Sequence, residues 1–92
     1  MKFMVIARPR QDADAGEIRD GMTGEREHTR RLRDEGRISA AYLSADEPAV
    51  FLVFEVTDAN ELSATLAEFP LYRLLQWDVV PLGSSPFEST AS

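Results

Sequence analysis

The sequence has 92 residues, a length that builds one hydrophobic core and leaves no room for a separate second domain. With 43% hydrophobic and 28% charged residues, its composition is that of an ordinary soluble globular protein. The formal net charge of −6 argues against a nucleic-acid partner, because phosphate neutralisation needs clustered lysine and arginine. We expect small molecules or proteins as partners.

The sequence contains no cysteine and a single histidine. Disulfides, thiolate nucleophiles and thiolate metal ligands are therefore excluded, and one histidine cannot build a multi-histidine zinc site within one chain. The apolar N-terminal run meets Arg8 and Arg10 before a signal peptide or a membrane span is complete. We expect a cytoplasmic protein with no bound metal and no membrane partner.

The first strand is expected at residues 2–7, which combine β-branched and aromatic side chains. It should stop before Pro9, because proline lacks the N–H that a central sheet ladder needs. Apolar residues then recur with the period of an α-helix from about residue 13 to 35, and Gly36 follows as a C-terminal stop. This pattern predicts one long helix, interrupted, if anywhere, at one of the glycines in its middle.

Two strands that form a hairpin are predicted next, at residues 37–43 and 49–56. The residues between them, 44–48, have the serine, aspartate and proline content of a turn. The second strand is apolar on both alternating faces, which is typical of a strand that is covered on both sides.

A second helix and a fourth strand complete the predicted elements. Thr57 or Asp58 can cap this helix, Pro70 marks its end, and the strand follows at residues 74–82. The apolar stripe of the helix consists of Leu62, Leu66 and Phe69. Residues 83–92 are polar apart from Phe87, and they predict a tail that is flexible or packed on a neighbouring subunit.

The order strand, helix, strand, strand, helix, strand predicts an α+β domain of ferredoxin-like βαββαβ topology over residues 1–82. Its four-stranded antiparallel sheet would carry both helices on one face. The strands supply more apolar surface than two helices can cover, including Met4, Ile6, Trp77 and Val79. We therefore predict that a second copy packs sheet against sheet, as a homodimer or higher homo-oligomer; the alternative is a patchy sheet face on a monomer.

Glu25 is the first candidate catalytic residue. At about 100° per residue it falls in the middle of an apolar helical stripe, formed by Ile18, Met22, Thr29 and Leu32. A carboxylate on an inward face must find hydrogen bonds, bind a cation or raise its pKa, and a raised pKa suits a proton shuttle on carbon. Alternatively, the helix begins near Gly24 and Glu25 is a first-turn residue favoured by the helix dipole.

Two further side chains are candidates for assisting Glu25 in catalysis. His28 lies three residues later on the flank of the same stripe, where it could orient the carboxylate or share its proton. It could equally be a solvated residue, since three arginines follow it closely. Tyr42 offers a phenolic O–H to a substrate oxygen, as Tyr72 does for binding, although amphipathic packing explains most such tyrosines.

Other residues are candidates for substrate binding. Arginines just outside regular elements could hold a substrate carboxylate, although a lone arginine is most often a surface charge: Arg8, Arg37 and Arg73. Aromatic residues could wall an apolar cavity, although core packing also accounts for them: Phe51, Phe54, Phe69 and Trp77. No nucleotide-binding, metal-binding or nucleophile-elbow motif occurs, so we expect cofactor-free chemistry if the protein is an enzyme.

Three segments resemble muconolactone isomerases. Residues 24–36, with acidic residues at the start and a closing Glu-Gly, are similar to the family's first-helix signature. Residues 53–56 resemble its third strand, and residues 62–72 resemble its second helix with a Leu-Pro-Leu-Phe close. The resemblance runs from residue 24 to 82 without an evident gap, and it bears on fold more strongly than on activity.

The resemblance implies a dimeric α+β barrel that assembles further into rings, and a cofactor-free proton shift that moves a C=C bond toward an enol-lactone. It places Glu25 as the acidic residue of the proton shuttle. This sequence has Met4, Ala40 and Leu43 where the family has polar or charged residues, which implies a more apolar pocket. The substrate could then be another lactone, or a polyketide-like or aromatic compound.

Two alternatives to the isomerase remain open from the sequence. One is a cofactor-independent cyclase or monooxygenase of the same barrel type, which would use the apolar cavity without a strong carboxylate base. The other is a non-enzymatic module for small-ligand binding or assembly.

Overall fold

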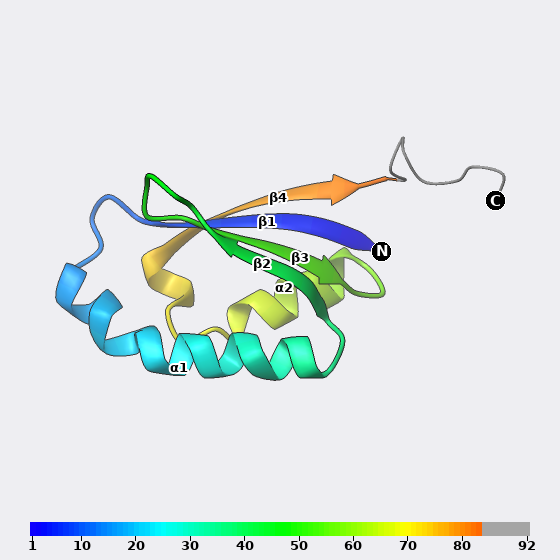
Figure 1. The fold of residues 1–92 in the computed structure, drawn as a ribbon, viewed down its shortest axis with the longest axis horizontal. Coiled ribbons are helices and arrows are strands. Elements are labelled where there is room, and N and C mark those ends of the chain that lie inside the picture. The colour runs from blue at the N-terminus through cyan, green and yellow to red at the C-terminus, as the bar shows by residue number, and fades with distance from the viewer. Residues whose placement is uncertain (84–92) are drawn as a thin grey trace, which may run out of the picture.

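The computed structural model describes residues 1–83, which form one sheet covered by two helices (Figure 1). In chain order the elements are β1 (Lys2–Pro9), α1 (Ala15–Asp34), β2 (Ile38–Leu43), β3 (Val50–Glu55), α2 (Ala59–Ala67), the 3₁₀ helix η1 (Tyr72–Leu74) and β4 (Leu75–Leu82). The strands pair antiparallel in the order β2-β3-β1-β4, and both helices lie on the same face. The predicted ferredoxin-like α+β topology is confirmed. Apart from Gly83, the expected tail lies outside the described residues.

Two features of the first half of the chain refine the sequence-based expectation. β1 continues to Pro9, which pairs with Leu75, because a proline at the last position of a strand interrupts no further ladder bond. α1 is continuous through its glycines. Asp14 caps its N-terminus, where the Asp14 carboxylate accepts the Glu17 N–H at 3.0 Å. Gly36 follows its C-terminus with φ of +81°, as expected of a C-terminal stop.

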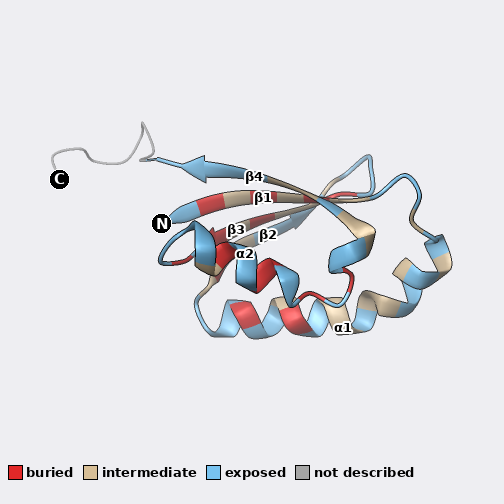
Figure 2. Ribbon diagram, turned by 180° about the vertical axis from the view of Figure 1, so that it is seen from behind, coloured by how far each residue is buried: buried red, intermediate tan, exposed pale blue. Residues whose placement is uncertain are grey.

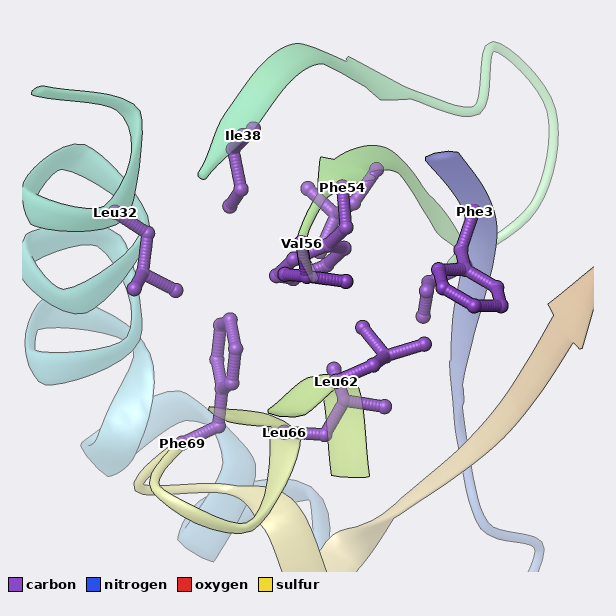
Figure 3. Close-up of a cluster of buried hydrophobic side chains, with 10 residues drawn as sticks. Phe3, Leu32, Ile38, Phe54, Val56, Leu62, Leu66 and Phe69 are labelled. Atoms are coloured by element: carbon purple, nitrogen blue, oxygen red, sulfur yellow. The ribbon is translucent and has the colours of Figure 1, made fainter. Parts of the chain in front are cut away.

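The hydrophobic core lies between the helices and the inner face of the sheet (Figure 3). Phe3 of β1 and Phe54 of β3 are paired across the ladder, and Phe54 is fully buried. Leu32 from α1 and Leu66 from α2 point into the same cluster. Burying a large apolar side chain stabilises a fold by about 1.5–3 kcal/mol, so this cluster fixes how α1 lies on the sheet.

The outer face of the sheet carries no helix, and much of β2 and β4 is exposed in Figure 2. Its apolar side chains lie in one band across all four strands: Met4, Ile6, Ala40, Tyr42, Phe51, Val53 and Val80. Trp77 and Val79 are not part of this face, contrary to expectation. Their pairing with Ala7 and Val5 turns them toward the helices, because side chains alternate along a strand.

Neither helix within residues 1–83 combines the length and the apolar composition that a membrane crossing requires.

Candidate active site

A cavity of about 380 Å³ lies between α1 and the inner face of the sheet. Its walls come from α1, the end of β1, the β2–β3 hairpin and the segment from Phe69 to Trp77. Most of the lining side chains are apolar, among them Met22, Leu52 and Leu75. A site of this kind takes a small, largely apolar molecule and leaves its few polar groups to orient that molecule.

The helical period brings one face of α1 to the cavity. Ile18, Met22, Glu25 and Thr29, spaced three or four residues apart, all line it. At Gly21 the helix approaches the segment after α2 so closely that a Cβ atom there would lie 2.3 Å from Leu71 Cδ2. Glycine at this position therefore sets the distance between α1 and that segment.

Glu25 is half-buried at the wall of the cavity. Its Oε2 accepts a hydrogen bond of 3.1 Å from the backbone N–H of Leu71. Burial raises the pKa of this carboxyl above its usual value of 4.5, and the Leu71 hydrogen bond opposes part of that rise. α1 begins ten residues earlier, so the alternative of a first-turn Glu25 does not apply. A carboxyl group in this setting can take up and return a proton.

The Leu71 N–H is aimed at Glu25 by two tight turns after α2. The Phe69 N–H donates to the Leu66 carbonyl at 3.1 Å, and the Tyr72 N–H donates to the Phe69 carbonyl at 3.0 Å. The Leu71 side chain is buried, so the segment is also held by packing. The backbone donor is thus fixed in place before any ligand binds, which keeps the carboxyl group in one orientation.

His28 is buried in the contact between α1 and α2 and does not line the cavity. Arg31 Nη2 lies 2.6 Å from His28 Nδ1, and the ring packs edge-on against Phe69 with centroids 4.4 Å apart. Because a guanidinium group can only donate, Nδ1 is the acceptor and the neutral ring carries its proton on Nε2. Nε2 has no hydrogen-bond partner within residues 1–83.

The pKa of His28 is lowered from its usual value of 6.5, first by burial and then by the Arg31 charge. The carboxylates of Glu68 and Glu35 oppose this shift. Among residues 1–83 the side chain that bonds to His28 is that of Arg31, so the structure does not bring His28 together with Glu25.

Three candidate residues lie on the outer side of the sheet: Tyr42, Phe51 and Arg8. Tyr42 is 67% exposed there and pairs with Phe51 on β3. Arg8 binds Glu47 of the β2–β3 hairpin and Asp78 of β4, each at 3.0 Å. Its guanidinium group therefore ties the hairpin to the sheet and does not line the cavity.

The remaining candidates divide between the cavity and its surroundings. Trp77 lines the cavity, and its Nε1 donates to the Tyr72 carbonyl at 3.1 Å while the two rings stack with centroids 6.0 Å apart. Phe54 is in the core, and Phe69 lies both in the core and at the cavity wall. The two remaining arginines, Arg73 and Arg37, do not line the cavity. Arg73 is exposed, and Arg37 pairs with Glu35 at 3.4 Å.

Two groups at the site were not anticipated from the sequence. Arg26 lines the cavity beside Glu25, and only its place next to that residue could have pointed to it. The Leu71 N–H carries no sequence signal, because any residue but proline offers one.

Within residues 1–83 no three histidine or acidic side chains gather closely enough to hold a metal ion.

The fold and this site together define a small ferredoxin-like α+β protein with an apolar cavity and one half-buried carboxyl group in its wall. Residues 1–88 match the family model of muconolactone delta-isomerase, so the chain belongs to that family. The resemblance found in three segments of the sequence is thereby confirmed over nearly the whole chain. No curated protein sequence matches the chain.

Two solved structures are similar to this one. The crystal structure of a muconolactone isomerase has a TM-score of 0.81 and 27% identity, with 96% of this chain and 94% of that chain covered. The 5-chloro-2-hydroxyhydroquinone dehydrochlorinase from Burkholderia phenoliruptrix AC1100, in complex with 2,5-dihydroxybenzoquinone, has a TM-score of 0.68 and 17% identity. It covers 97% of this chain and 100% of its own, and at that identity it shows the shared fold alone.

Proposed function

We propose that this protein is a cofactor-free isomerase that shifts a C=C bond by proton transfer in an unsaturated lactone or a related enolisable compound. The observation that carries the proposal is the Glu25 carboxyl group in the wall of an apolar cavity, where burial raises its pKa. Membership of the muconolactone delta-isomerase family supports the same chemistry.

In the proposed reaction the Glu25 carboxylate removes the proton on the γ carbon of an α,β-unsaturated lactone. The C–H electron pair forms a new C=C bond between the β and γ carbons, and the original double bond shifts so that charge moves onto the carbonyl oxygen, giving a dienolate. Glu25 then returns the same proton to the α carbon next to the carbonyl, so the double bond moves to the enol-lactone position and nothing is oxidised or reduced. Apolar walls favour this route, because they hinder exchange of the proton with water.

The Leu71 N–H has a defined part in this mechanism. It holds Glu25 Oε2 at 3.1 Å, so the second oxygen, Oε1, is the one we assign to the substrate proton. The hydrogen bond favours the ionised form and burial favours the neutral form, so the two effects keep the carboxyl group able to act in both directions.

We also propose that the protein works as a homodimer or higher homo-oligomer built sheet against sheet. The outer face presents its apolar band between two groups of ion pairs, Lys2 with Glu55 at one end and Arg8 with Asp78 at the other. An apolar centre with a polar rim is typical of protein interfaces. In this arrangement Tyr42 contacts the second copy and not the substrate held by Glu25.

Substituting Glu25→Gln tests the proposed reaction, with muconolactone and related unsaturated lactones as substrates. Loss of a positioned proton carrier should lower kcat by about 10²–10⁴-fold. The matched control is Glu27→Gln, because Glu27 is exposed and does not line the cavity. Proton NMR in D₂O should show that most product carries the original hydrogen, since the transfer is intramolecular.

The pH dependence follows from the direction of the Glu25 shift. The base form is required at the start, so kcat/KM should fall as pH drops below a midpoint that lies above 4.5. Retention of most turnover by Glu25→Gln would contradict the isomerase mechanism. It would favour a cyclase or monooxygenase that relies on substrate reactivity, whereas absence of any turnover or ligand binding in the native protein would favour an assembly module.

A further inference from the structure

Most polar side chains that line the cavity already have partners. The Thr29 hydroxyl donates to the Glu25 carbonyl at 2.9 Å, and the Ser44 hydroxyl donates to Asp46 at 3.0 Å. Glu47 is held by Arg8. The two hydroxyl protons and the Glu47 charge are therefore already engaged within the protein.

Arg26 differs from them in charge and in bonding. It is the one cationic residue among those that line the cavity. Within residues 1–83 its guanidinium group takes part in none of the ion pairs or side-chain hydrogen bonds. It follows Glu25 directly on α1, so it lies about 100° further round the helix, toward the exposed rim of the cavity.

We propose that Arg26 is a specificity-determining residue that selects ligands carrying a carboxylate at one end of an apolar body. The guanidinium fork matches a carboxylate and can bind both of its oxygens, while the apolar walls accept the remainder of the molecule. With the carboxylate at the rim, the body of the ligand extends past Glu25. Our inference rests on the proposed use of this cavity for substrate, and it adds which end of the substrate is recognised and by which residue.

A pair of ring compounds of equal size tests this role without requiring turnover. 2-Naphthoate and 2-naphthol share the apolar body, and near neutral pH only the first is charged. The native protein should bind naphthoate more tightly, as measured by isothermal titration calorimetry. Arg26→Gln should weaken naphthoate binding about tenfold, the range of a charge-assisted hydrogen bond, and leave naphthol binding unchanged.

Arg30→Gln is the matched control, because this arginine is also exposed, lies one turn further along α1 and does not line the cavity. It removes the same charge from the protein and should leave both affinities as they are. Arg26→Lys should restore only part of the preference, since an ammonium group lacks the fork.

Three results would overturn the assignment of Arg26. In the first, the native protein binds the two compounds with equal affinity. In the second, Arg26→Gln and Arg30→Gln lose the same affinity for naphthoate. In the third, Arg26→Gln loses as much affinity for naphthol as for naphthoate. Failure of both compounds to bind the native protein would remove the cavity as a ligand site and the proposed function with it. A normal naphthoate preference with full activity in Glu25→Gln would leave Arg26 in its role and refute the isomerase mechanism alone.

Discussion

Replacing Gly21 with alanine should destabilise the protein, although alanine is the better helix former. The added Cβ would lie 2.3 Å from Leu71 Cδ2 and 3.1 Å from Leu71 Cγ, well inside contact distance. Leu71 is 4% exposed, so its side chain must shift within the packed interior or into the cavity. Overpacking of this kind costs about 1–3 kcal/mol. The gain in helix propensity offsets about 1 kcal/mol of that cost, leaving a net loss of about 0–2 kcal/mol.

Gly24→Ala is the matched control for this substitution. It lies in the same helix three residues later, and its Cβ would meet Pro70 Cγ at 3.4 Å, an ordinary contact. Only the helix propensity term then remains, so this variant should be more stable than the native protein by up to about 1 kcal/mol. The difference between the two variants isolates the clash with Leu71.

Urea unfolding, followed by circular dichroism, gives the free energy of unfolding of both variants. Equal stability of Gly21→Ala and Gly24→Ala would refute the close packing of α1 against Leu71. A second measurement connects this packing to the site, because displacement of Leu71 weakens its N–H bond to Glu25. The pKa of Glu25 in Gly21→Ala, measured by NMR titration, should then rise further above 4.5, since burial is left unopposed.

The other two predictions concern pH and assembly. The pKa of His28 is lowered in the folded protein. The neutral His28 ring therefore contributes fully to stability above pH 6.5, and this contribution is lost as the pH falls through the folded-state pKa of His28. His28→Leu should abolish this loss of stability, which is measured as the free energy of unfolding in urea at successive pH values. The same loss in the native protein and in the variant would contradict the prediction. Phe51→Asp places a charge in the apolar band of the outer face and should give monomers in analytical ultracentrifugation. An unchanged mass would remove the sheet-against-sheet arrangement.

The local elements were predictable because their signals are carried by neighbouring residues. Asp14 at the start and Gly36 at the end of α1, and Asp58 at the start of α2, satisfy backbone groups within their own turns. The helical period predicted the inward position of Glu25, and the start of α1 at Ala15 decided for it against the first-turn alternative. The position of Trp77 did not, because the face to which a strand residue points depends on its register with the neighbouring strands.

Roles that depend on distant residues were decided only by the tertiary structure. Arg8 pairs with Glu47 and Asp78, which lie 39 and 70 residues away in the chain, and no local pattern encodes such partners. For the same reason the Leu71 N–H, 46 residues from Glu25, became visible only in the fold. The sequence by itself determined the order of helices and strands, since periodicity and capping are local. Packing between distant segments decided which backbone donor the Glu25 carboxyl group meets, because α1 and the segment after α2 come together only in the folded chain.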